Sequence, residues 1–277
     1  MGIDIPFPQG ISLKIGEPLQ DRKGYPTGRL QKGFILLDHG EQMAEEAVGF
    51  GVPVLKRGLQ AIFPGDVSLT WQRTGSTWEV TALFQMNLVE KISKSDHENV
   101  GSNWLYRVKD ILAESIRRFP PLRGLLTGIS SMLRKVFNLK TIYVAGEFST
   151  ELKVTTTLDG STGRMVVVVE AGRLPAEVTE VVVMNEQGAN FFDSYGDSGG
   201  NSLQGAEIGC WDEVSAQEAW FESSASRVAF KLRQAEGGQL FRGRELIGSR
   251  LAWAGFGYSF PASAQGIRYE MKIERLA

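Results

Sequence analysis

Aromatic and acidic side chains are concentrated between Asn190 and Glu222, a mixture suited to recognising a sugar. This stretch holds two of the chain's six tryptophans. Flat aromatic faces stack on the apolar side of a pyranose ring, and carboxylates accept hydrogen bonds from its hydroxyls or act as general acid and base. We therefore expect a saccharide ligand. The candidate binding residues are Asp193, Trp211, Glu213 and Trp220. The alternative is that these aromatic residues belong to the core and stand beside solvated acidic loops.

Ser198 is a candidate nucleophile. The pentapeptide Gly196-Asp197-Ser198-Gly199-Gly200 resembles the sequence around the nucleophile of trypsin-like serine proteases. The resemblance implies Ser198 as nucleophile, neighbouring backbone N–H groups as oxyanion donors and His39 as base. The chain departs from that family in the residues around His39 and in having no disulfides. A pentapeptide of this kind also occurs by chance in a loop rich in glycine and serine, and we expect such a loop over residues 194–205.

The two histidines, His39 and His97, are the other candidates for catalysis. Each stands beside acidic residues, and a neighbouring carboxylate readily moves the pKa of a histidine across neutrality. Neither has the spacing of a His-x-His or His-Glu-x-x-His metal motif, so we expect no metal and no cofactor. Whether any of these residues is catalytic stays open at this point.

Composition limits the class of protein. The chain has 277 residues, a size that one large all-β domain can fill, and 30 basic against 32 acidic residues give a net charge of -2. A nearly neutral surface disfavours generic binding of nucleic acid. Cys210 is the single cysteine, which suits the cytoplasm. No apolar run is long enough to span a membrane, and residues 1–10 do not have the pattern of a signal peptide.

Alternating apolar and polar residues predict that the chain is mainly antiparallel β-sheet. Apolar residues fall on even positions from Thr141 to Leu158, and the pair Asp159-Gly160 predicts a hairpin into Arg164–Glu170. The continuous run Met165–Val169 is typical of a strand covered on both faces. The other predicted strands are Phe34–Leu37, Val52–Leu55, Val67–Arg73, Thr77–Ile92, Val178–Met184, Arg227–Arg233 and Ile267–Ile273. We interpret Gly237-Gly238 and Arg242–Glu245 as turns.

A helical insert interrupts this pattern. Between about 102 and 138 the apolar residues recur at three- and four-residue spacing, broken by Pro120-Pro121, which predicts two amphipathic helices. Residues 103–140 contain eight basic and two acidic residues, a net +6. Such a helix pair either packs on the sheet with its charges solvated or docks on an anionic membrane or acidic partner. The basic residues of the predicted membrane contact are Arg117, Arg118, Arg123, Arg134 and Lys135.

The succession of antiparallel strands, with the aromatic and acidic segment, resembles the large β-supersandwich of galactose-mutarotase-like proteins. The resemblance implies carbohydrate binding across the concave face of a sheet and, in catalytic members, two histidines and a glutamate as acid and base. The surroundings of His39 and His97 lack the expected His-Pro segment, so no catalytic residue is carried over. We expect one β-rich domain over residues 1–277, a large antiparallel sandwich with one inserted helical pair, that binds or modifies a sugar.

Overall fold

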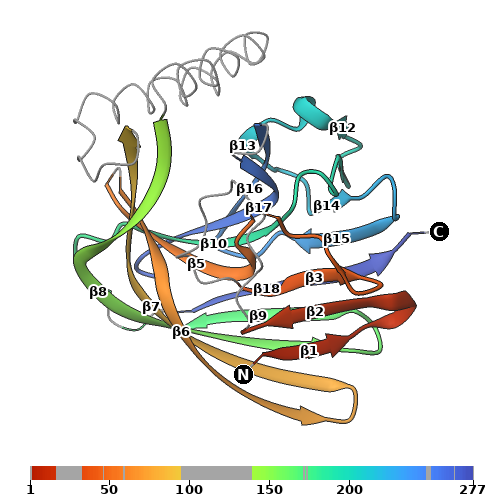
Figure 1. Cartoon of the computed structure of the whole chain (residues 1–277), viewed down its shortest axis with the longest axis horizontal. Helices are drawn as coiled ribbons and strands as arrows, with labels where there is room; N and C mark the ends of the chain where they lie inside the picture. The colour runs from red at the N-terminus through yellow and green to blue at the C-terminus, as the bar shows by residue number, and fades with distance from the viewer. Residues whose placement is uncertain are drawn as a thin grey trace.

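The computed structural model describes residues 2–16, 33–45, 47–58, 60–94, 139–170, 172, 174–247, 251–264 and 266–276. Their regular structure is dominated by antiparallel β-sheet, which confirms the mainly antiparallel β part of the predicted fold class (Figure 1). None of the helical turns within these ranges has the length and apolarity needed to cross a membrane. The helical pair expected at about 102–138, with its basic residues, and His97 lie outside the described residues.

A small sheet forms the N-terminal part of the fold. Its strands follow one another in space in the order β1-β2-β3-β4. They are β1 (Ile3–Pro6), β2 (Ile11–Ile15), β3 (Ile35–Asp38) and β4 (Glu41–Gln42), and the short 3-10 turn η1 (Pro8–Gly10) joins the first two. Alternate residues of β1 and β2 are buried, as the period of a half-buried strand requires.

The remaining described strands form one long antiparallel sheet in the order β12-β11-β14-β15-β18-β9-β8-β7-β6-β5-β10-β17-β16-β13. They are β5 (Gly49–Arg57), β6 (Gln60–Thr74), β7 (Thr77–Lys94), β8 (Leu139–Asp159), β9 (Arg164–Glu170), β10 (Glu180–Gln187), β11 (Ser194–Asp197), β12 (Ser202–Gln204), β13 (Cys210–Glu213), β14 (Glu218–Glu222), β15 (Val228–Arg233), β16 (Gln239–Ile247), β17 (Leu251–Pro261) and β18 (Ile267–Arg275). The 3-10 turn η3 (Gly205–Ile208) connects β12 to β13.

Three local predictions were wrong. Residues 194–205, expected to be a loop, contain β11 and β12, and Arg242–Glu245, expected to be a turn, lies inside β16. Pairing with neighbouring strands overrides the turn preference of glycine in both segments. The run Met165–Val169 is not covered equally on both faces, because Val166 and Val168 are only half-buried.

The long sheet curls over itself and encloses an aromatic core. The ring of Phe256 on β17 lies 4.9 Å from that of Phe221 on β14, and Tyr258 lies 4.8 Å from Tyr269 on β18. The layer β10-β17-β16-β13 therefore packs against the layer β11-β14-β15-β18, as in a sandwich. Residues of the small sheet join the same hydrophobic cluster, so one core serves both sheets.

Buried amides on β10 fix this strand to its surroundings. The Gln187 side chain accepts a hydrogen bond from the Leu36 amide and donates one to the Phe34 carbonyl, both at 3.1 Å. Asn185 Oδ1 accepts hydrogen bonds from the hydroxyl of Tyr269 at 2.9 Å and from the amide of a bulged glycine in β5. These bonds satisfy buried polar groups and hold β10 rigidly, and β10 carries part of the candidate site.

Candidate functional site

The candidate site lies on the side of the layer β10-β17-β16-β13 that faces away from the aromatic core, which we call the outer face. Because Phe256 and Tyr258 point into the core, their neighbours Gly257 and Ser259 point to the outer face. The residues opposite them in the register share that face. The outer face thus contains Val182 and Met184 of β10, Gly257 and Ser259 of β17, Gln239 and Phe241 of β16, and Trp211 and Glu213 of β13.

Trp211 is held on the outer face in a strained backbone conformation. The register of β13 against β16 shifts between Cys210 and Asp212, so Trp211 is the extra residue of a β-bulge. Its φ is 57°, a left-handed value that a bulky side chain adopts only when its surroundings impose it. The indole is half-buried and stacks on Trp253, with ring centroids 4.8 Å apart and an angle of 17° between the planes. The bulge therefore aims a flat aromatic surface along the outer face.

Two glycines make room for these rings. A Cβ atom at Gly243 would lie 2.8 Å from Cη2 of Trp253 and 3.0 Å from the backbone nitrogen of Trp211. A Cβ atom at Gly257 would lie 3.1 Å from Cζ3 of Trp211. Both distances are shorter than ordinary carbon contacts, so the absence of a side chain at these positions is a condition for the stack.

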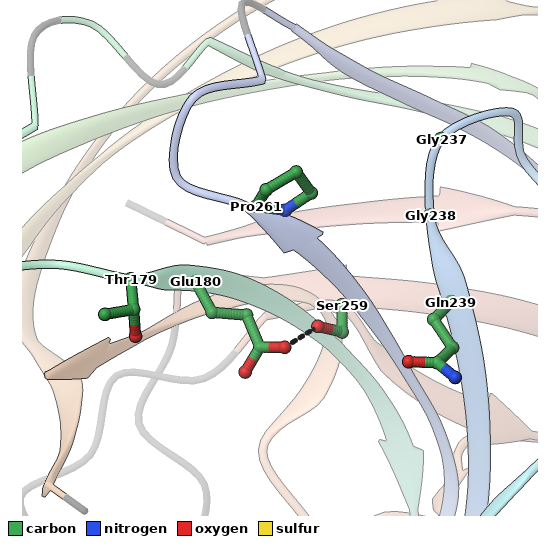
Figure 2. A pocket seen from close by; sticks show the side chains of 7 residues that line it. All are labelled: Thr179, Glu180, Gly237, Gly238, Gln239, Ser259 and Pro261. Carbon is green, nitrogen blue, oxygen red and sulfur yellow. Dashed lines mark hydrogen bonds between the residues drawn. The ribbon is translucent and has the colours of Figure 1, made fainter. Parts of the chain in front are cut away.

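A polar pocket opens beside the tryptophan pair. It has a volume of about 530 Å³ and is lined by Thr179, Glu180, Gly237, Gly238, Gln239, Ser259 and Pro261. The hydroxyl of Ser259 donates a hydrogen bond to the carboxylate of Glu180, and Gln239 lies directly opposite Ser259 across the β16–β17 pair (Figure 2). The pocket thus offers a carboxylate as acceptor and an amide as both donor and acceptor.

The pocket and the Trp211 ring are neighbours on the outer face. The ring lies over Gly257, and Ser259 is two residues further along the same strand, which corresponds to ~7 Å. Val182, whose Cγ1 is also close to the Gly257 position, pairs directly with Ser259. An aromatic plane next to a few convergent polar groups is the composition of a site for a small amphipathic ligand, with one apolar side and several hydroxyls.

Of the four binding residues predicted from the sequence, the structure brings two together. Trp211 and Glu213 share the outer face, where Glu213 pairs with Phe241 and is exposed. Trp220 neighbours the core residue Phe221 on β14 and therefore points away from the core on the opposite layer. There it packs over Gly196 and lies 5.7 Å from Nζ of Lys231.

Asp193 lies apart from the outer face, just before β11. Its carboxylate accepts a hydrogen bond of 2.9 Å from the amide of Ser224, and its carbonyl accepts one from the amide of Gly205. Asp193 therefore ties together two chain segments at the β11–β12 end of the sheet. The predicted set of four does not form a single site.

Ser198 has no histidine among its contacts in the described part of the chain. Its hydroxyl accepts a hydrogen bond of 3.2 Å from the amide of Glu218. His39 has an exposed side chain whose Nε2 lies 3.8 Å from Asp38 and 3.5 Å from a guanidinium nitrogen of Arg275. The contacts of Ser198 and His39 share no residue, so the structure does not show the serine–histidine pair that the pentapeptide implies.

Asp197, next to Ser198, has a structural environment. Its buried carboxylate accepts hydrogen bonds from the Tyr195 hydroxyl at 2.7 Å, from the Gly199 amide at 2.9 Å and from the backbone and side chain of Asn201. Burial by itself raises the pKa of Asp197, but these hydrogen bonds outweigh it and hold the pKa below its ordinary value. The ionised carboxylate thereby fixes the turn between β11 and β12.

Sequence reasoning missed Glu180, Gln239, Ser259 and Trp253. The first is in a predicted strand, but only the register of β10 with β17 shows that it meets Ser259. The alternation of glycines at 255 and 257 inside an apolar run was a usable signal, because glycine within a strand often marks the close approach of another group. Within the described ranges, no group of three or more His, Cys, Asp or Glu side chains is arranged to hold a metal ion.

The chain is similar in fold to proteins of known structure. No family model matches it, and no curated protein matches it in sequence. It is similar to the α-N-acetylgalactosaminidase NagBb from Bifidobacterium bifidum in complex with GalNAc, with 10% identity, a TM-score of 0.51, and coverage of 99% of this chain and 36% of that chain. The chain thus spans about a third of the length of that enzyme. At this identity the likeness shows the fold alone.

Two further solved structures match almost over their full length. The Slr1438 protein from Synechocystis sp. PCC 6803 is 10% identical, with coverage of 100% of this chain and 96% of that chain and a TM-score of 0.42. A galactose mutarotase-like protein from Clostridium acetobutylicum is 9% identical, with coverage of 97% and 94% and a TM-score of 0.41.

Proposed function

We propose that this chain is a carbohydrate-binding module, and that the sugar binds on the outer face between Trp211 and the Glu180 pocket. The observation that carries the proposal is the stacked pair Trp211–Trp253, held by a strained bulge next to a carboxylate, an amide and a hydroxyl. The flat ring of Trp211 takes the apolar face of a pyranose, while Glu180 and Gln239 bond its hydroxyls. The fold shared with a galactosaminidase supports the choice of ligand class.

The strained backbone of Trp211 also supports a sugar site at this residue. A left-handed tryptophan costs on the order of 1–3 kcal/mol, and positions of this kind cluster at binding sites, where the strain pre-organises a side chain. Trp220 lacks such a feature, because it is a regular member of β14 with a lysine over its ring. The proposed site therefore lies on the face that carries Trp211 and Glu213, and it does not include Trp220 or Asp193.

The test compares two tryptophan variants of the same chemistry. Replacing Trp211 by alanine should lower the affinity for a bound saccharide by about tenfold or more, which corresponds to ~1.4 kcal/mol. Trp220→Ala is the matched control, because it removes an indole that is also half-buried but lies on the opposite layer. Calorimetric titration measures both affinities. Equal losses in the two variants, or no loss in a folded Trp211→Ala protein, would refute the location of the site.

A second variant separates binding from folding. Glu180→Gln keeps the size of the side chain and its ability to accept from Ser259 but removes the negative charge. We expect a several-fold loss of affinity with little change in the melting temperature. An unchanged affinity would show that the pocket does not take part in binding, and the tryptophan pair alone would then remain as the proposed site.

Docking on an anionic membrane or acidic partner through Arg117, Arg118, Arg123, Arg134 and Lys135 stays a separate prediction, because these residues lie outside the described ranges. Its test is cosedimentation with vesicles rich in anionic lipid, which should fall as salt rises. The cytoplasmic location and the assignment of residues 1–277 to one domain likewise stay predictions.

A further inference from the structure

A second pair of aromatic rings lies on the same side of the sheet as the Trp211–Trp253 stack. Phe63 of β6 and Tyr143 of β8 have ring centroids 5.1 Å apart in an edge-to-face arrangement. Both rings are half-buried and pack against a small apolar cluster separate from the main core, formed by Val48, Val52 and Leu88. Met184, which belongs to the outer face, packs against this cluster as well.

The strand register connects the two aromatic pairs. Met184 of β10 lies directly between Val52 of β5 and Gly257 of β17, and Gly257 lies under the ring of Trp211. An apolar strip therefore runs from the stacked tryptophans to Phe63 and Tyr143: Val182 and Met184 are its half-buried members, and Val52 and Gly257 are buried beneath it. Figure 1 shows β5 and β10 between the bent strands β7 and β8 on one side and β13 and β16 on the other. From β17 to β5 the strip covers two strand spacings, which is ~10 Å.

We propose that this strip binds an oligosaccharide of at least two sugar units laid across the strands. The inference rests on the proposed function, because it takes the Trp211 site as the position of the first unit. A second unit then stacks at Phe63 and Tyr143, beyond the reach of a single pyranose ring at Trp211. The polar groups are at one end of the strip, where Glu180 and Gln239 fix the first unit.

The part of the strip between the two aromatic pairs favours stacking of sugar rings over hydrogen bonding to their hydroxyls. Val182 and Met184, the half-buried residues between the two aromatic pairs, carry no nitrogen or oxygen in their side chains. The apolar faces of successive sugar rings can pack on this surface, while their hydroxyls stay hydrated and incur no desolvation penalty. Affinity should therefore grow with the number of sugar units until both aromatic pairs are covered, and then stop growing.

The experiment uses the full chain and neutral oligosaccharides of one to four units from three series: N-acetylglucosamine, galactose and glucose. Calorimetric titration gives the affinity of each length. For the series that binds, we expect affinity to rise by about tenfold or more from the monosaccharide to the trisaccharide. Tyr143→Ala should remove about tenfold of the affinity for the longer sugars and change the affinity for the monosaccharide by less than about twofold.

Two controls separate the alternatives. Tyr143→Phe keeps the ring and should keep the affinity, and Phe63→Ala, which removes the partner ring, should reproduce the effect of Tyr143→Ala. If all lengths bind with equal affinity and Tyr143→Ala does not change that affinity, the oligosaccharide inference is refuted. The proposed site at Trp211 is not affected by that result. Absence of binding for every sugar of the three series would count against the proposed function itself.

Discussion

Replacing Gly243 by alanine should dismantle the tryptophan stack. A Cβ atom at this position would lie 2.8 and 2.9 Å from two ring atoms of Trp253 and 3.0 Å from the backbone nitrogen of Trp211. The backbone cannot move away easily, because Cys210 pairs with Gly243 and Asp212 pairs with Arg242. The ring of Trp253 must therefore shift. Overpacking of a filled site costs ~1–3 kcal/mol, and a lost aromatic pair adds ~0.5–1.5 kcal/mol.

The assay is denaturant unfolding combined with near-ultraviolet circular dichroism. Gly243→Ala should lower the free energy of unfolding by about 1.5–4.5 kcal/mol and change the tryptophan signal of the native protein. Gly266→Ala is the matched control, since a Cβ atom there meets nothing within 4 Å, and we expect a change within about 0.5 kcal/mol. A Gly243→Ala protein with unchanged stability and an unchanged spectrum would refute the claim that the glycine makes room for the stack.

Three further outcomes follow from other parts of the structure. Hydrogen bonds lower the pKa of Asp197 in the folded state, so its carboxylate stabilises the protein above its ordinary pKa of ~4 and loses this contribution as the pH falls through the lower, folded value. Asp197→Asn should cost ~1–3 kcal/mol at neutral pH, and the stability of the variant should fall less than that of the parent protein as the pH drops below about 4. Tyr269→Phe, which removes a buried hydrogen bond to Asn185, should cost ~1 kcal/mol in denaturant unfolding, and an unchanged midpoint would contradict the role of that bond. A fluorophosphonate should not label Ser198, whose hydroxyl contacts a backbone amide and no histidine among the described residues; labelling lost in Ser198→Ala would revive the hydrolase alternative.

Much of the sheet could be predicted from the sequence, because the strands that cross the core alternate strictly. Residues Arg164–Glu170 were predicted with the bounds that β9 has, and the even-numbered apolar residues from Phe148 to Leu158 are buried in β8. The short strands β11, β12, β13 and β14 were missed. They contain glycine, serine and acidic residues, and it is pairing with distant strands that holds them in the sheet.

The candidate site was predicted only in part, for a related reason. Trp211 and Trp220 look alike in the sequence, since both stand among acidic residues. Which of them joins a site depends on a one-residue bulge in β13 and on the curl of the sheet, which puts the two side chains on opposite layers. Glu180 and Ser259 are 79 positions apart, and only the pairing of β10 with β17 brings them together.

The most direct test of the proposed site is a titration followed by NMR of the six indole N–H groups, assigned by single Trp→Phe variants. Saccharide from the series that stabilises the protein against heat should be added to the full chain. We expect the resonances of Trp211 and Trp253 to shift with a common binding curve while those of Trp220 and Trp71 stay in place. Shifts confined to Trp220, or a saturating ligand that moves neither Trp211 nor Trp253, would contradict a sugar site on the outer face.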